Sequence, residues 1–163
     1  MLVKDRMSTP AVTIRSNADY KTALRLMQEH ALHHVPVLDA AGHLAGILAE
    51  RDLLIAAMRY LQSTVEVSEI MHRDVVTVGP DTPITAAAML MLNHKIGGLP
   101  VTGAGDRVIG IITESDIFRA FVETLPEEKV INVRPSPSRA KPLRVSPAAG
   151  RKPKAFRRVK RAL

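Results

Sequence analysis

An internal repeat constrains the fold of this chain more than any other feature of its sequence. Residues 7–58 align with residues 71–122 at an offset of 64 without a gap, and 15 of the 52 aligned positions are identical. The identities include Met7 with Met71, Pro36-Val37 with Pro100-Val101, Gly46-Ile47 with Gly110-Ile111, Glu50 with Glu114, and Asp52 with Asp116. One unit of about 60 residues buries little surface alone. Two units are therefore expected to share a core around a pseudo-twofold axis, which creates two equivalent clefts.

Each repeat is predicted to fold in the order β-α-β-β-α. The strands are expected at 11–14, 35–38 and 44–48 in the first repeat, and at 75–78, 99–102 and 108–112 in the second. This order predicts an α/β fold of the α+β type, built from two tandem units at 2–62 and 66–125.

Local signals predict where the helices begin and where the chain turns. Asn17 is the expected cap of the first helix, and Asp81 or Thr82 is the expected cap of its counterpart. The closing helix of each repeat is expected to begin near Glu50 or Glu114. Residues 103–106 (GAGD) lack the Lys-Ser/Thr ending of a phosphate-binding loop and are predicted to form a hairpin turn.

The positive charge of the chain is concentrated at its C-terminal end. Residues 129–163 contain 12 of the 23 Lys and Arg, five of the 11 Pro and none of the 16 Asp and Glu. This composition predicts a disordered basic tail, because too few large apolar side chains offset the entropy of folding. The last residues, AFRRVKRAL, suit a short basic amphipathic helix on a partner.

Three interpretations of this tail stay open. It has no function, or it binds nucleic acid or another polyanion through counterion release, or it docks on an acidic protein or an anionic membrane surface. Phe156 is its single aromatic residue, which makes stacking on bases a weak argument.

The composition also excludes several classes of protein. The absence of Cys rules out disulfide scaffolds, thiolate metal sites and cysteine nucleophiles, and it suits a cytoplasmic protein. No apolar run reaches the roughly 18–20 residues that span a bilayer, and no apolar stretch follows the first charges as in a secretory signal. No Ser/His/Asp arrangement emerges from the spacing, so no enzyme activity and no catalytic residue are expected.

Three signatures recur in both repeats and carry a resemblance to a known family. They are a Met before the first strand (Met7, Met71), a Pro-Val strand, and a closing pattern G-h-h-x-x-x-D at 46–52 and 110–116, in which h is apolar. In these respects the chain resembles the cystathionine β-synthase (CBS) domain over residues 2–123, and a tandem pair of such domains forms a Bateman module. The resemblance implies a regulatory module that binds AMP, ADP, ATP or S-adenosylmethionine between its units and modulates a partner. No catalytic cofactor is required, and the chain is expected to stand alone as a sensor.

The resemblance also implies site residues at the closing motifs. The family's residues that match Thr113 and Asp116 contact phosphate and ribose, and the alternative is that both only cap the helix that follows them. In the first repeat, Ala49 replaces the hydroxyl, Asp52 remains and Arg51 adds a cation. That cleft is expected either to be empty or to hold phosphate through different contacts.

Further contacts are expected from backbone and from histidine. In the family, backbone near the first strand and before the Pro-Val strand contacts the adenine, which corresponds here to Val75, Val76, Thr77, Gly98, Leu99 and Pro100. Gly97 and Gly98 suit either close approach of a ligand or the end of a helix. His34, with His33 beside it, suits a phosphate contact or ordinary packing. No metal site is expected, because no carboxylate or Cys stands at ligand spacing from these histidines.

A second function remains open beside the sensor. The repeats could serve only as a non-catalytic dimerisation or assembly module, with the basic tail binding nucleic acid or an acidic partner. Modules of this family commonly form dimers through their helices, and the predicted helices at 53–58 and 117–122 carry enough apolar residues for such an interface.

Overall fold

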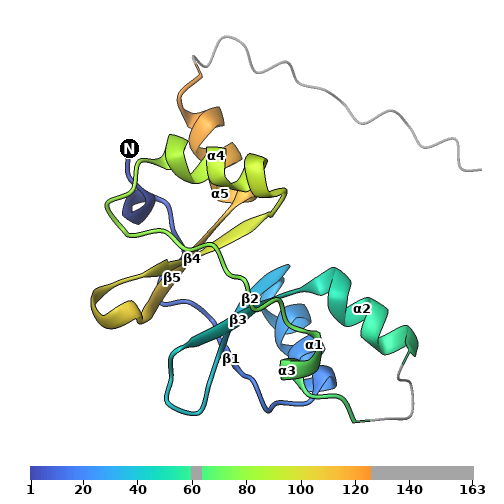
Figure 1. The fold of residues 1–163 in the computed structure, drawn as a ribbon. Helices are drawn as coiled ribbons and strands as arrows, with labels where there is room; N and C mark the ends of the chain where they lie inside the picture. The colour runs from blue at the N-terminus through green and yellow to red at the C-terminus, as the bar shows by residue number, and fades with distance from the viewer. Residues whose placement is uncertain (60–63, 126–163) are drawn as a thin grey trace, which may run out of the picture. The chain divides into compact units, whose positions relative to one another are not determined.

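The computed structural model describes residues 1–59 and 64–125 (Figure 1). The first repeat contains η1 (Val3–Asp5), β1 (Ile14–Arg15), α1 (Tyr20–His30), β2 (His34–Leu38), β3 (Leu44–Ala49) and α2 (Glu50–Arg59). The second contains α3 (Val67–Ile70), α4 (Ile84–His94), β4 (Gly98–Thr102), η2 (Ala104–Asp106), β5 (Val108–Thr113) and α5 (Glu114–Glu123). The predicted α/β class is confirmed. The tail predicted at 129–163 lies outside the described residues.

The two hairpins have the same register. β2 pairs antiparallel with β3 and β4 pairs antiparallel with β5, with Val37 opposite Gly46 and Val101 opposite Gly110. Both ladders shift register at the following residue. In each repeat a turn follows the first of these strands, and residues 103–106 connect β4 to β5 as predicted.

The first strands of the two repeats differ. The strand predicted at 11–14 is confined to β1, which pairs in parallel with β2, whereas the strand predicted at 75–78 is reduced to one bridge between Val78 and Val101. Gly79 stands at the position equivalent to Arg15, and its N–H bonds to the Thr82 hydroxyl at 3.1 Å instead of extending the strand. Gly weakens a strand because it brings no side chain to pack and a large entropy cost.

The starts of the two central helices correct two of the local predictions. Asp19, not Asn17, caps α1, and its carboxylate accepts the N–H of Lys21 at 2.7 Å. Pro83 precedes α4 without a side-chain cap bond, so neither Asp81 nor Thr82 caps this helix.

Both central helices end at a left-handed residue. Ala31 (φ 51°) ends α1 and Lys95 (φ 55°) ends α4. The N–H of each bonds back to carbonyls of the last turn, so Gly97 and Gly98 are not the C-cap. In contrast, the predicted starts of α2 and α5 at Glu50 and Glu114 are confirmed.

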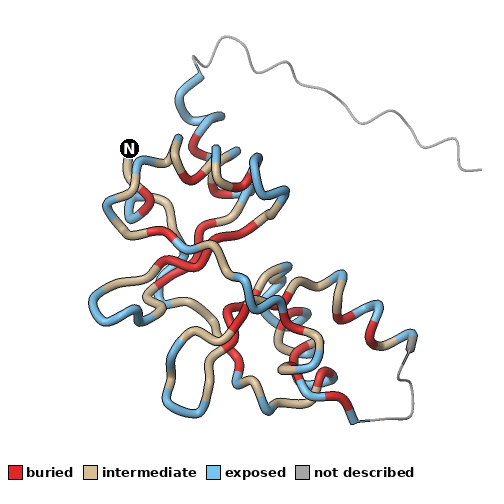
Figure 2. The backbone as a smooth tube through the Cα atoms, in the orientation of Figure 1, coloured by how far each residue is buried: buried red, intermediate tan, exposed pale blue. Residues whose placement is uncertain are grey.

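The single shared core predicted from the sequence is wrong: each repeat has its own buried core, and each core is completed by a segment from elsewhere in the chain (Figure 2). Val67 and Met71, which precede the second repeat's first strand, are buried in the core of the first repeat. Val3, which precedes the first repeat's first strand, is fully buried in the core of the second. The predicted units, 2–62 and 66–125, are consecutive along the chain. In the packed structure, however, the segment that leads into each repeat lies in the core of the other repeat.

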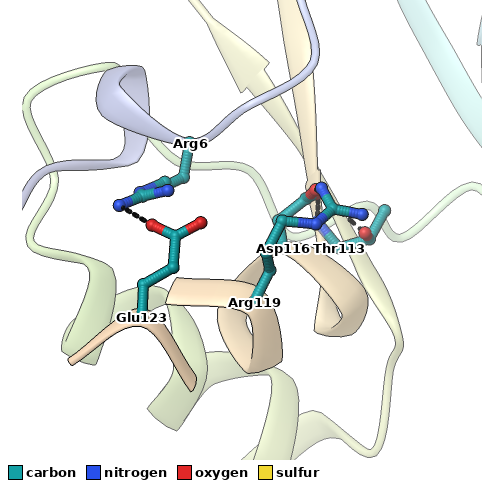
Figure 3. Close-up of polar contacts among 5 residues, drawn as sticks. All are labelled: Arg6, Thr113, Asp116, Arg119 and Glu123. Carbon is teal, nitrogen blue, oxygen red and sulfur yellow. Dashed lines mark hydrogen bonds and ion pairs between the residues drawn. The ribbon is translucent and has the colours of Figure 1, made fainter. Parts of the chain in front are cut away.

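Polar contacts hold the exchanged segments in place. The Val3 N–H donates to Thr82 O at 2.9 Å, and the Val67 N–H donates to Ala18 O at 2.8 Å. Arg6 and Glu123 form an ion pair at 2.5 Å, which joins the N-terminal segment to the end of α5 (Figure 3).

The exchange explains why Gly and Met recur in the repeat. A Cβ on Gly46 would lie 2.7 Å from both His72 O and Met71 Sδ. A Cβ on Gly110 would lie 2.9 Å from both Met7 Sδ and the Ser8 carbonyl oxygen. Only glycine allows each leading segment to approach the hairpin of the other repeat this closely.

Over residues 1–59 and 64–125, the structure contains no helix with the length and apolar character needed to cross a bilayer.

Candidate functional site

A cavity of about 730 Å³ lies between the start of α2 and two segments of the second repeat. The first repeat contributes residues of β2, β3 and α2, including Ala49, Arg51 and Asp52. The second repeat contributes residues 72–76, 94–98 and Glu114. A volume of this size falls in the range of small-molecule sites.

The start of α2 places two carboxylates at the cavity, and each meets a histidine. β3 ends at Ala49, and the Glu50 N–H donates to His33 O at 2.9 Å, which fixes the turn from strand to helix. Glu50 Oε2 lies 2.6 Å from His33 Nδ1. Asp52 Oδ2 lies 3.0 Å from His72 Nε2, and the Asp52 side chain is 18% exposed.

His34 lies against the two glycines that precede β4. A Cβ added to Gly97 would lie 2.9 Å from His34 Cε1, and one on Gly98 would lie 3.2 Å from His34 Cγ. These glycines therefore leave room for an imidazole. Gly98 occupies the position in the second repeat that His34 occupies in the first. The imidazole of His34 thus packs against a residue without a side chain.

The surroundings of His34 disfavour its charged form. Burial lowers the pKa of His34 below its ordinary value of 6.5, and the neighbouring His33 lowers it further. Glu114 and Asp52 act in the opposite direction but do not outweigh the burial.

Thr113 and Asp116 lie outside the residues that line the cavity. The Thr113 N–H and hydroxyl both donate to Asp116 Oδ2, at 2.9 and 2.7 Å, and Arg119 Nη1 lies 3.5 Å from Oδ1 (Figure 3). The Asp116 side chain is only 9% exposed. Of the two uses foreseen for this pair, the geometry displays the capping of α5.

The cavity brings together six of the residues predicted from the sequence: His34, Arg51, Asp52, Val75, Val76 and Gly98. Five other predicted residues do not line it: Thr77, Leu99, Pro100, Thr113 and Asp116. Leu99 and Pro100 are fully buried in β4, and Thr77 is exposed beyond the lining segment.

Sequence reasoning missed several charged residues of the cavity, among them Glu50, His72, Arg73, Lys95 and Glu114. The repeated Glu at 50 and 114 was a usable signal. His72 and Arg73 had none, because their position depends on the exchange of leading segments.

The charges around the cavity nearly cancel. Three permanent cations line it: Arg51, Arg73 and Lys95. Four carboxylates line it as well: Glu50, Asp52, Asp74 and Glu114. In the part of the chain that the structure describes, no group of three or more His and carboxylate side chains could hold a metal ion.

Comparison with known proteins identifies the family to which the two repeats are similar. A family model described as the CBS domain matches the chain twice, at residues 3–59 and 67–123. The CBS domain pair of protein MJ0100, solved with 5′-methylthioadenosine and S-adenosyl-L-methionine, is similar with a TM-score of 0.71 and 34% identity, covering 77% of this chain and 98% of that one. CBSX2, solved with AMP, is similar with a TM-score of 0.66 and 27% identity, covering 75% and 96%.

A curated relative is much longer than this chain. The L-aspartate semialdehyde sulfurtransferase of Methanocaldococcus jannaschii is 37% identical over 120 residues, which are 74% of this chain but 23% of that protein. The chain thus spans about a quarter of that relative's length.

Proposed function

The chain belongs to the CBS domain family, and on that premise we propose that its repeat pair is a regulatory module that binds an adenosine compound in the cavity beside Asp52. The observation that carries the proposal is the cavity itself, which joins both repeats at the closing motif of the first. Similar CBS pairs have been solved with AMP and with S-adenosylmethionine and methylthioadenosine. Because its walls come from both repeats, a ligand that prefers one arrangement of them shifts the module toward it.

Each lining residue has a role in this proposal. Asp52 accepts a ribose hydroxyl on the carboxylate oxygen that His72 does not use. Val75, Val76 and the backbone at Gly98 form the side of the cavity that faces the adenine. The other three predicted residues lie further along the same segments, and only their backbone is expected to contact the adenine: Thr77, Leu99 and Pro100. His34 and Arg51 face the substituent at the 5′ position of the ribose.

A second cleft at Thr113 and Asp116 remains part of the prediction. The carboxylate of Asp116 already accepts two hydrogen bonds from Thr113 and faces Arg119. A ribose at this position shares that carboxylate with the helix cap, so we expect weaker binding here than beside Asp52.

Calorimetric titration of the full chain with AMP, ADP, ATP and S-adenosylmethionine tests the proposal. We expect saturable binding that Asp52→Asn weakens by about 10- to 100-fold, because a hydrogen bond to a charged group contributes about 1.5–3 kcal/mol. Asp74→Asn is the matched control, since it removes an equal charge from another residue of the same cavity.

The outcomes separate the two clefts. Unchanged affinity in Asp52→Asn together with a large loss in Asp116→Asn would move the site to the second cleft. Two molecules bound per chain would support both clefts. Silence from all four ligands would contradict the proposal and favour the assembly function.

The exposed apolar faces of two helices support a homodimer as the form in which the module meets a partner. Leu54, Ile55 and Met58 are exposed on α2, and Phe118, Phe121 and Val122 are exposed on α5. Burying such side chains against a second copy is favourable. Light scattering should report a dimer that Phe118→Glu with Phe121→Glu dissociates, and a monomeric wild type would contradict this part. The basic tail, for which polyanion or acidic-protein partners were predicted, lies outside the described residues.

A further inference from the structure

Histidines are concentrated at the cavity. Four of the six histidines of the chain line it: His33, His34, His72 and His94. With all four neutral, the three permanent cations and four carboxylates leave the lining with a net charge of −1; with all four protonated, the net charge is +3. The sign of the charge that a ligand meets therefore depends on these imidazoles.

Among the described residues, His34 and His94 are the two members of this set that face no carboxylate at hydrogen-bond distance, and His94 is exposed whereas His34 is half-buried. The His34 ring is half-buried against Gly97 and Gly98, and within residues 1–59 and 64–125 it has no hydrogen-bond or ion-pair partner. The titratable groups that act on it are His33 beside it, Asp52 on α2 and Glu114 on α5. An arriving anion would supply the partner that the folded chain does not.

Two of the other histidines lie against carboxylates of the lining. His33 lies 2.6 Å from Glu50, and His72 lies 3.0 Å from Asp52. Two of the four carboxylates of the lining therefore already face an imidazole nitrogen of the folded chain. His94 stands beside Lys95 at the end of α4, on the side of the second repeat.

We propose that the cavity selects phosphate-bearing adenosine nucleotides over uncharged adenosine compounds, and that His34 takes up a proton when the phosphate binds. This inference rests on the function proposed above and adds the ligand class and its dependence on pH. Near neutral pH the free site holds a neutral imidazole, since burial lowers its pKa. The bound phosphate stabilises the imidazolium, so binding draws a proton from solution.

The sign of the effect follows from this linkage. Because the complex holds one more proton than the free protein, the affinity for AMP rises as the pH falls from about 8 to about 6.5, by at most about tenfold per pH unit for one proton. Below that range the phosphate itself begins to protonate, with a pKa of about 6, and the gain diminishes. 5′-Methylthioadenosine keeps the adenosine and lacks the phosphate, so its affinity should not change.

The test is calorimetric titration of the full chain with AMP and with 5′-methylthioadenosine at several pH values, in buffers of different ionisation enthalpy. We expect proton uptake with AMP alone, and a preference for AMP that grows as the pH falls. His34→Gln should remove the uptake and flatten the pH profile. His30→Gln, an exposed histidine outside the cavity lining, should change neither.

Each result decides a separate point. Binding of both ligands without proton uptake overturns this inference and leaves the proposed function standing. Uptake that persists in folded His34→Gln overturns the assignment to His34. Absence of binding by both ligands overturns the proposed function, and the inference with it.

Discussion

The two repeats place the same carboxylate in two different environments. Asp52 and Asp116 occupy equivalent positions in helices that begin in the same way, with the Glu50 N–H bonded to His33 O and the Glu114 N–H bonded to Gly97 O. In the second repeat, Thr113 donates two hydrogen bonds to Asp116, whose side chain is 9% exposed. In the first repeat, Ala49 has no hydroxyl, and Asp52 instead meets His72 at the cavity.

The two aspartates thus have different surroundings, and the residue just before each helix differs in the same way: Thr113 carries a hydroxyl and Ala49 does not. Where the hydroxyl is present, the carboxylate closes the first turn of a helix. Where it is absent, the carboxylate faces a cavity. We therefore expect substitutions in the second repeat to affect mainly stability, and those in the first to affect mainly binding.

Substitutions at Gly46 and Gly110 test whether the stability of both repeats depends equally on the exchanged segments. Gly46→Ala should lower the free energy of unfolding by about 3 kcal/mol and Gly110→Ala by about 2 kcal/mol, because an added Cβ meets backbone that cannot move freely. The first contact is the tighter, at 2.7 against 2.9 Å. Urea denaturation measures both.

Gly79→Ala is the control for the glycine pair, since its nearest neighbour is a side-chain oxygen 3.8 Å away. Its effect should stay within about 1 kcal/mol. A loss in Gly46→Ala no greater than in this control would contradict the exchanged packing.

The two aspartates test the division of roles directly. Asp116→Ala should cost about 2 kcal/mol of stability, because it leaves the Thr113 N–H and hydroxyl without their partner in a part-buried site. Asp52→Ala should cost about 0.5 kcal/mol, as expected for a partly exposed ion pair. Thermal and urea unfolding of the two variants in parallel measure the difference, and equal losses would refute it.

The smallest expected effect concerns the pH dependence of folding. Burial lowers the pKa of His34 below 6.5, so on acidification the unfolded chain binds a proton before the folded chain does. Stability should fall as the pH drops below about 6.5 and should not depend on this group above it. His34→Gln should make the decline shallower, as followed by urea unfolding between about pH 7 and 5.

His30→Gln serves as the control for the pH profile as well, because this histidine is exposed at the end of α1. A decline that is equally steep in His34→Gln would show that other groups govern the acid range.

Much of the fold was predictable because its signals are local. The hairpin strands and the starts of α2 and α5 follow from runs of β-formers, turn residues and acidic helix starts that recur 64 residues apart. The caps were less predictable. Asp19 rather than Asn17 caps α1, because Ser16, Asn17 and Asp19 are all chemically suited to the role and only the path of the chain selects one.

Six of the 18 residues that line the cavity were predicted as site residues, and the rest were missed for a related reason. Asp52, Arg51 and His34 carry motif signals of their own. His72 and Arg73 reach the cavity only because α3 and the residues after it lie on the first repeat. No pattern within 72–76 encodes that contact, since it depends on a hairpin some 25 residues earlier.

The sequence by itself determined the duplication, the order of the helices and hairpin strands in each half and the family signatures, because each depends on neighbours along the chain. The tertiary structure decided which half each leading segment completes, and which of two equivalent carboxylates faces a cavity. Those outcomes depend on contacts between distant segments, and the two carboxylates also differ in the residue before their helix, which carries a hydroxyl at Thr113 and only a methyl at Ala49.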